Sequence, residues 1–347
     1  MKKYFQFAIL SITALVCSTR INAQMPDSVK NYIDTAIHIL QTRSLFGKDL
    51  DWKKIRDTAY LKAQNATSYK EAFPAISYAF LQLNDYHGMV ANRDTFVRIP
   101  SPIDFEKSLS AGLKKEAAKG PRIVTAWLDQ SVAYLRVPTM IVHRQEAMDE
   151  LANKLRDSLC MLLAKNPKSL VLDLRLNNGG NAAPMQSGLG PLFHFSVLGY
   201  GVDRDNQFLP PVQMKDGVVL DEKGNKMVAV KNTCTASKNL PIAVLIGLST
   251  VSSAEITAAF LKPQPNVKLF GEATPGFCGA TEGFLFGNQQ GYLLFSVNRI
   301  ADSKKHIYQD LVVRPDVYVK SDDNFDDLTA DPTVKEALSW LNTQKNK

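Results

Sequence analysis

A strand–helix–strand unit between residues 131 and 175 constrains the fold of this chain more than any other feature. Residues 131–137 alternate as a strand that Pro138 ends, and residues 169–175 form a short apolar run typical of a buried strand. The helix between them carries its apolar residues on one face: Ala147, Leu151, Leu155, Leu159 and Leu162. This order predicts a right-handed crossover between parallel strands, and therefore an α/β fold.

A second strand and helix flank a serine-rich turn. Residues 241–247 are apolar and bounded by Pro and Gly, which indicates a buried strand, and residues 256–261 suit a helix. Ser252 lies on the turn between them, above the helix N-terminus, where free N–H groups and the helix dipole favour negative charge. This is the logic of a nucleophile elbow, without the G-x-S-x-G spelling. The alternative is that Ser252 or Ser253 only caps the helix, with Glu255 completing a capping box.

The strand at residues 169–175 runs into Asn177, Asn178, Gly179 and Gly180. Paired glycines at the carboxyl end of a parallel strand leave backbone N–H groups open to a ligand. A tight turn would need the same glycines.

The first residues predict a secretory signal peptide over residues 1–23. Lys2 and Lys3 precede an apolar run too short to anchor the chain in a membrane, and small residues end at Ala23. A lipid anchor at Cys17 is the alternative, although Val16 stands where a small residue would be needed. We therefore expect a soluble, exported protein, periplasmic or extracellular.

Charge and cysteine content limit the possible partners. The formal charge of +7 falls to +4 without the signal peptide, because Lys2, Lys3 and Arg20 are lost, and this gives no argument for nucleic-acid binding. Cys160, Cys234 and Cys278 remain, an odd number that allows at most one disulfide. Neither these cysteines nor the histidines have metal-ligand spacing, so we expect no metal and no cofactor.

The rest of the chain divides into a helical part and a mixed part. Residues 26–90 have helical periodicity, and we expect an N-terminal helical domain over 24–105 and a catalytic core over 106–347. Within the core, residues 200–240 suggest an irregular insertion. A hairpin is expected at 283–300, another extended segment at 311–319, and a closing helix at 332–342 that Asp331 caps.

Five segments in one order resemble a known family. The chain is similar to the tail-specific, or C-terminal processing, serine peptidases, and within them to the tricorn-core branch. The resemblance implies a crotonase-like (ClpP/crotonase) α/β core, peptide hydrolysis, a peptide or protein substrate, and Ser252 as the nucleophile. It rests on residues 85–87, 173–180, 250–255, 271–276 and 313–316, which read DYH, DLRLNNGG, TVSSAE, GEATPG and VRPD.

The general base implied by the resemblance is His87. The Ser–Lys branch of the family carries a lysine where this chain has Phe277, and an aromatic ring cannot accept a proton. The tricorn-like branch takes its base from a D-x-H segment, which His87 matches. A neutral imidazole suits that role near pH 7.

The group that orients the histidine is less clear from the sequence. The family tends to place a glutamate where this chain has Gln309, beside Asp310. A neutral amide can hold the ring but stabilises an imidazolium less than a carboxylate does. Asp310, Asp85 or Glu255 could substitute.

The oxyanion hole implied by the resemblance is made of backbone N–H groups, from Ser253 and from Gly179 or Gly180. Glu255 is expected to stabilise the start of the helix, or to hold the site residues in place without contacting the substrate. Asp173 and Arg175 are expected to be structural partners.

The resemblance leaves two functions open. The gap between His87 and residue 131 is too short for the PDZ module that many members insert. We expect an exported serine endopeptidase. The alternative is a catalytically impaired member that binds peptides or hydrophobic ligands, which Phe277 and Gln309 favour. A third hypothesis, an acyl-CoA enzyme on the same fold, is weaker, because export would separate the protein from its cofactor.

Overall fold

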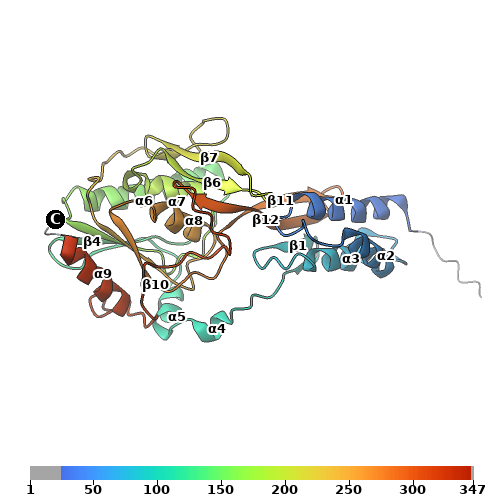
Figure 1. Cartoon of the computed structure of the whole chain (residues 1–347), viewed down its shortest axis with the longest axis horizontal. Coiled ribbons are helices and arrows are strands. Elements are labelled where there is room, and N and C mark those ends of the chain that lie inside the picture. The colour runs from blue at the N-terminus through green and yellow to red at the C-terminus, as the bar shows by residue number, and fades with distance from the viewer. Residues whose placement is uncertain (1–24, 345–347) are drawn as a thin grey trace, which may run out of the picture.

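The computed structural model describes residues 25–344, so the predicted signal peptide at 1–23 lies outside the described residues. Two β-sheets organise the described chain, one of six strands and one of seven. Helices cover both faces of the first sheet, and the mixed α/β class predicted from the sequence is confirmed (Figure 1). No helix in the described part is long and apolar enough to cross a bilayer.

The six-stranded sheet is built on the predicted crossovers. Its strand order is β13-β10-β9-β5-β4-β3, parallel except for β3. Both continuous apolar runs became central strands with every residue buried, as expected for a sheet covered on two sides. The strands are β3 (Val124–Trp127), β4 (Val132–Arg136), β5 (Ser169–Asp173), β9 (Ile242–Ile246), β10 (Val267–Gly271) and β13 (Val317–Tyr318).

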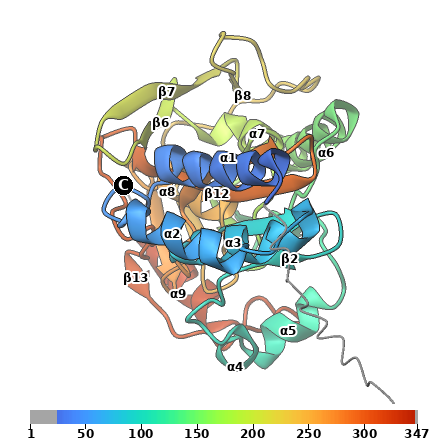
Figure 2. The same ribbon diagram turned by 90° about the vertical axis from the view of Figure 1, so that its right-hand side faces the viewer.

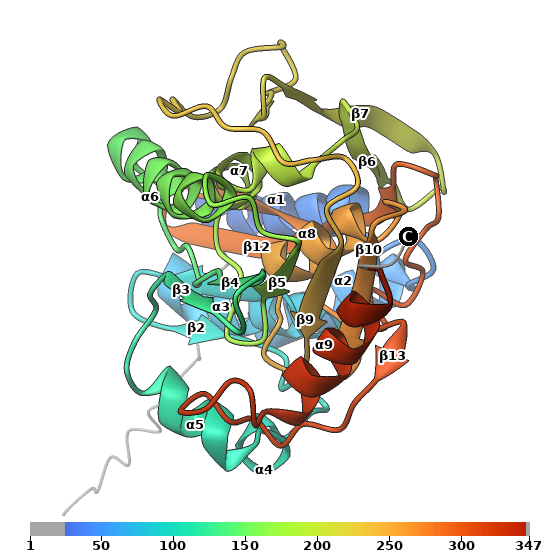
Figure 3. The same cartoon turned by 90° about the vertical axis from the view of Figure 1, so that its left-hand side faces the viewer.

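Alternating residues of the central strands face two different helical layers. In β4, Ala133 and Leu135 pack toward α6 (Gln145–Leu163), α7 (Ala182–Gly188) and α8 (Ser253–Leu261). Val132 and Tyr134 pack toward α9 (Pro332–Gln344) on the other face. Figure 3 shows α6 and α9 on opposite sides of these strands. Asp331 caps α9 as predicted, accepting a hydrogen bond of 3.0 Å from Val334 N–H.

The seven-stranded sheet corrects one prediction. Strands occupy much of residues 197–219, where an irregular insertion was expected. The prediction was wrong because β7 is mostly exposed, so it carries no apolar period to read. The sheet order is β2-β1-β12-β6-β7-β8, with β11 paired to β12. The strands are β1 (Met89–Asn92), β2 (Phe96–Val97), β6 (Val197–Val202), β7 (Phe208–Lys215), β8 (Val218–Val219), β11 (Gly279–Phe286) and β12 (Gly291–Asp302).

Three N-terminal helices pack on the far end of the β11–β12 hairpin (Figures 1 and 2). They are α1 (Asp27–Arg43), α2 (Trp52–Lys62) and α3 (Tyr69–Leu81), and the apolar face of α1 predicted from the sequence is buried. Phe286, Leu293 and Phe295 of the hairpin belong to the same hydrophobic cluster as the helices. The other end of the hairpin, at Ile300, belongs to the core of the central sheet.

Two short helices and a disulfide complete the described fold. The helices α4 (Phe105–Ser108) and α5 (Ala111–Ala117) link the helical part to β3, and the 3-10 turn η1 (Gly190–Leu192) follows α7. Cys160 of α6 and Cys234 form a disulfide, which is the single bridge that the cysteine count allowed. Cys278 is a buried free thiol.

Candidate active site

Ser252 occupies a strained position between β9 and α8. Its backbone angles are φ 58° and ψ −120°, a region that residues with a Cβ rarely adopt. Hydrogen bonds fasten the turn to the end of β5: Thr250 Oγ1 donates to Leu174 O at 3.0 Å, and Val251 N–H to Asn177 O at 3.0 Å. The strain is therefore held by surrounding contacts, and the side chain stands at the N-terminus of α8.

The paired glycines lie directly against this serine. A Cβ added to Gly179 would come within 2.8 Å of the Ser252 Cβ and 2.6 Å of Val251 O, so only glycine fits there. The Gly179 N–H donates to Asn177 Oδ1 at 2.9 Å. Within residues 25–344, no acceptor is found for the N–H of Gly180. The predicted oxyanion residues Gly179, Gly180 and Ser253 are thus brought together, and Gly180 holds the uncommitted donor of the pair.

Glu255 joins the elbow to the loop that follows β10. Its carboxylate accepts hydrogen bonds from Ser252 N–H at 2.7 Å, Gly276 N–H at 3.1 Å and Phe277 N–H at 3.0 Å. The bond to Ser252 is the glutamate half of a capping box. Burial raises the pKa of Glu255 to about 7, against the lowering effect of Thr274 and these backbone donors. Glu255 therefore holds two loops in place.

His87 approaches the elbow through Phe277. The two rings meet edge to face, with centroids 5.3 Å apart, and the Phe277 N–H is bonded to Glu255. Burial lowers the pKa of His87 to about 4, with a smaller contribution from the charge of Arg98. The ring is therefore neutral near pH 7. Three contacts, through the two residues Phe277 and Glu255, connect it to Ser252.

The ring of His87 lacks an orienting partner. Its Nδ1 is buried and has no hydrogen-bond partner among the described residues. Asp85 accepts from the backbone N–H of His87 at 3.0 Å and from Ser296 N–H of β12 at 2.6 Å. Asp85 thus fixes the loop that carries His87, and its hydrogen bonds do not reach the ring.

Gln309 and Asp310 lie on an exposed loop after β12. The Asp310 carboxylate is paired with Arg314, and this hydrogen bond lowers its pKa. The backbone carbonyl of Asp310 would be 3.7 Å from a Cβ on Gly276, so this loop passes close to the Phe277 loop. No contact joins either side chain to His87 within residues 25–344. The orienting role of these two residues stays a prediction.

Comparison with known proteins identifies the chain. The sequence profile of peptidase family S41 matches residues 131–319, which is more than half of the protein and includes the elbow and both glycines. The chain belongs to peptidase family S41. The resemblance to the C-terminal processing serine peptidases is confirmed, and the activity typical of an S41 member is serine-type hydrolysis of peptide bonds.

Individual relatives of this S41 peptidase are distant. A nisin-resistance protein of Lactococcus lactis subsp. lactis is 24% identical over 321 residues, covering 92% of this chain and 89% of the relative. A lipoprotein of Streptococcus agalactiae has a similar fold at 22% identity, with a TM-score of 0.66 over 92% of this chain and 98% of that one. The photosystem II D1 C-terminal processing protease is similar at 15% identity, with a TM-score of 0.57 over 85% and 94%. These structures support the predicted fold of the S41 core.

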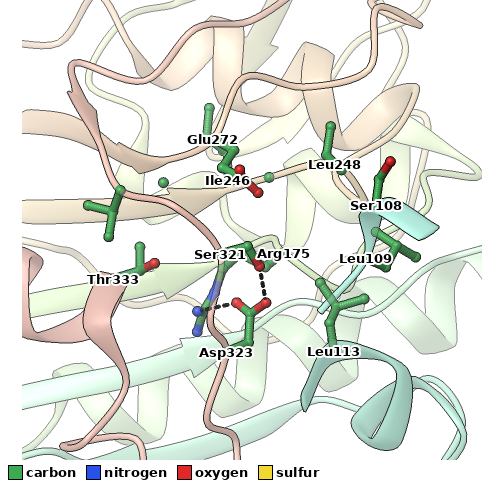
Figure 4. A pocket seen from close by; sticks show the side chains of 13 residues that line it. Ser108, Leu109, Leu113, Arg175, Ile246, Leu248, Glu272, Ser321, Asp323 and Thr333 are labelled. Atoms are coloured by element: carbon green, nitrogen blue, oxygen red, sulfur yellow. Dashed lines mark hydrogen bonds and ion pairs between the residues drawn. The ribbon is translucent and has the colours of Figure 1, made fainter. Parts of the chain in front are cut away.

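A charged network supports the S41 core from below the site. Arg175 donates to Asp173 at 2.7 Å, to Asp323 at 2.7 Å and to Asp331 at 2.9 Å, and all four side chains are buried. Figure 4 shows Arg175 bonded to Asp323, which also accepts from Ser321. The adjoining cavity measures about 10 Å³, room for one water molecule at most. The network is structural, as predicted for Asp173 and Arg175.

An apolar hollow lies beside α8. It measures about 980 Å³, and Ile256, Phe260 and Leu209 line it. Ile256 lies one helical turn after Ser252, and Asn181, which also lines the hollow, follows the glycine pair. The sequence analysis did not predict this hollow, because one of its walls is the exposed strand β7, whose apolar residues show no periodicity.

Sequence reasoning also missed the aromatic contact of His87. Phe277 was noted only as the residue that replaces a lysine, whereas its ring packs on the imidazole. The signal available was the residue type, since an aromatic side chain in a glycine-rich loop is an unusual choice.

Proposed function

We propose that this protein is an exported serine endopeptidase of the tricorn-like type. Ser252 attacks the scissile carbonyl and His87 removes its proton. The N–H groups of Ser253 and of Gly179 or Gly180 hold the oxyanion. The observation that carries the proposal is the strained backbone of Ser252, with Gly179 packed against it at the N-terminus of a helix. Such strain persists at a cost of about 1–3 kcal/mol and clusters at active sites.

The environment of His87 supports a base that is unprotonated at neutral pH. Its lowered pKa keeps the ring available as an acceptor. The same burial makes the imidazolium costly, so catalysis requires an acceptor at Nδ1 in the substrate complex. Catalytic hydrogen bonds often tighten only when substrate binds, and a candidate source is the loop of Gln309 and Asp310, which passes Gly276 beside Phe277.

The domain arrangement in this proposal keeps the predicted boundaries. Residues 24–105 form the helical domain that contributes His87, and residues 106–347 form the catalytic core without a PDZ module. Asp85 holds the loop that carries His87, and Glu255 holds the elbow that carries Ser252.

Export is supported by the disulfide between Cys160 and Cys234, since disulfides persist in oxidising compartments. Among the similar structures is a protein described as a lipoprotein. We infer a periplasmic or extracellular protein that peptides or proteins reach as substrates. Intact-mass measurement of the exported form should give a chain that begins at Gln24, and a lipid on Cys17 would contradict the predicted cleavage.

A fluorophosphonate probe tests the nucleophile. Wild-type protein should be labelled and Ser252→Ala should not be. Ser253→Ala is the matched control, because its buried hydroxyl has no partner among the described residues while its backbone N–H is kept. Equal labelling of wild type and Ser252→Ala would remove Ser252 from the mechanism.

The second candidate is a protein that binds peptides or hydrophobic ligands without cleaving them. Two observations favour it: the unpartnered Nδ1 of His87, and the hollow beside α8. The relative from Lactococcus lactis is named a nisin-resistance protein, and this name does not state a peptidase activity. Wild-type protein that binds peptides but is neither labelled nor able to cleave them would establish this candidate.

A further inference from the structure

A second cavity lies on the other side of the glycine turn. It measures about 190 Å³, and its lining includes Arg122, Arg136, Thr139 and Asn178. Asn178 immediately precedes Gly179, which packs against Ser252, and its own N–H is held by Thr139 Oγ1 at 2.8 Å. The cavity therefore borders the proposed oxyanion turn. Its chemistry differs from that of the hollow beside α8, because guanidinium groups line it.

Arg136 presents unused hydrogen-bond donors to this cavity. Its side chain is only 5% exposed, yet its one hydrogen bond within residues 25–344 goes from Nη2 to Glu116 at 2.8 Å. An arginine side chain has five N–H donors, and no Arg136 nitrogen is among the fully buried polar atoms of the described residues that lack a partner, so its remaining donors are open to the cavity. Phe325 packs over the guanidinium with its centroid 5.4 Å away, and aromatic packing takes up no N–H donor. An anion in the cavity would supply the missing acceptors.

The charge around the cavity is unbalanced in the same direction. Glu116 is paired with Lys119, Arg122 and Arg136 at once. Among the residues that line the cavity, Arg122 and Arg136 share one carboxylate, that of Glu116, which leaves one positive charge in excess. Such an excess in a partly enclosed cavity attracts anions.

We propose that this cavity binds a carboxylate of the peptide substrate, close to the scissile bond. The inference rests on the proposed function, because only a bound peptide would bring a carboxylate beside Ser252. A guanidinium with free parallel donors matches carboxylate geometry. The carboxylate belongs to a residue near the cleaved bond, because Asn178 of the cavity wall precedes Gly179, which packs against Ser252. It is either an acidic side chain or the free C-terminus of the substrate.

Fluorescence anisotropy with the full chain carrying Ser252→Ala tests this inference without turnover. The probes are fluorescein-labelled nonapeptide pools that differ only in Glu against Gln at internal positions, and in a free against an amidated C-terminus. The pools with a carboxylate should bind about tenfold more tightly than the neutral pool, as expected for a charge-assisted pair. Comparison of the Glu/amide pool with the Gln/free-acid pool identifies the source of the carboxylate.

Arginine variants assign the preference to the cavity. Arg122→Gln, on a partly exposed side chain, should lower the ratio between charged and neutral pools several-fold, and Arg136→Gln should abolish it. Arg122→Gln keeps the test valid if the buried variant does not fold. Arg43→Gln is the control, because it removes an exposed arginine of the helical part that is paired with Glu282.

Two results would overturn the inference. One is the absence of tighter binding by the carboxylate pools. The other is a preference that survives both Arg122→Gln and a folded Arg136→Gln. Failure of the proposed function gives a different result, namely wild-type protein that cleaves none of the pools whatever their charge.

Discussion

Two buried polar regions of this protein differ in how completely their groups are paired. Arg175 contacts three carboxylates, and Phe325 packs over it at 4.9 Å. His87 is also buried, but its Nδ1 has no partner within residues 25–344. A saturated network fixes the fold, whereas the imidazole of His87 still needs an acceptor at Nδ1 before it can carry a proton during catalysis. The comparison teaches that the buried charges of the core are fully paired, whereas the proposed base is held by packing on Phe277 and lacks a hydrogen bond at Nδ1 within the described residues.

The largest expected effect concerns His87, the residue whose ring nitrogen lacks a partner within the described residues. His87→Ala should lower kcat/KM on a quenched fluorescent peptide by at least about 10³-fold, because the base is lost. His194→Ala is a matched control: His194 also has a buried, unpartnered nitrogen and a pKa lowered by burial. Full activity of the His87 variant would assign the proton to another group and end the contrast drawn here.

A variant that breaks the fully paired Arg175 network should lower the stability of the protein. Arg175→Leu leaves Asp173, Asp323 and Asp331 without their shared cation, and we expect a loss of about 3–5 kcal/mol in the free energy of unfolding. Urea denaturation measures it. Arg314→Leu breaks an exposed pair and should cost about 1 kcal/mol or less. A small loss for Arg175→Leu would show that the network is dispensable.

The pH dependence of stability separates His87 from Glu255. The folded pKa of His87 is lowered from 6.5 to about 4, so its contribution to stability is lost as pH falls from 6.5 toward 4. The folded pKa of Glu255 is raised from 4.5 to about 7, so its contribution is lost as pH rises from 4.5 toward 7. Each shift corresponds to about 3 kcal/mol, and the two nearly cancel in the wild type.

Single variants should uncover the two slopes. His87→Ala leaves the contribution of Glu255, so stability should fall as pH rises between about 4.5 and 7. Glu255→Gln leaves the contribution of His87, so stability should rise as pH rises between about 4 and 6.5. Denaturant midpoints across this range measure both. Parallel pH profiles for the two variants would contradict the assigned shifts.

The smallest expected effect concerns the orienting group. Gln309→Glu should raise kcat/KM about threefold to tenfold if residue 309 faces the imidazolium during catalysis, because a carboxylate stabilises that cation. Asp310→Asn is the companion variant. A loss of activity in Asp310→Asn with no change in Gln309→Glu would transfer the orienting role to Asp310.

Buried elements of the fold could be predicted, because their patterns are set by burial. The strands β5 and β9 are continuous apolar runs, and the elbow between β9 and α8 follows from strand, turn and helix signals. The strand β7 could not, since most of it is exposed, and β6 could not, since Gly199 and Gly201 interrupt its apolar residues. Only Val317–Tyr318 became a strand where residues 311–319 were expected, because the preceding residues bond to the loops at Thr274 and Cys278.

The sequence predicted the residues of the candidate site, but not their pKa values or their hydrogen-bond partners. Ser252, Gly179 and His87 were selected from the sequence, whereas the lowered pKa of His87 depends on burial and on Arg98. The open donors of Arg136 depend on which carboxylates reach it from α5 and from the C-terminal segment. The disulfide partner of Cys160 was equally undetermined, since 74 residues separate it from Cys234.

The β11–β12 hairpin has a consequence for dissecting this protein. Because its Phe286 and Phe295 complete the interior of the N-terminal helices while its Ile300 completes that of the central sheet, neither part keeps an intact interior when separated. We expect two fragments divided near residue 105 to be recovered in folded form only when both are produced together. The Ser252 hydroxyl and the His87 imidazole should therefore be kept or lost together.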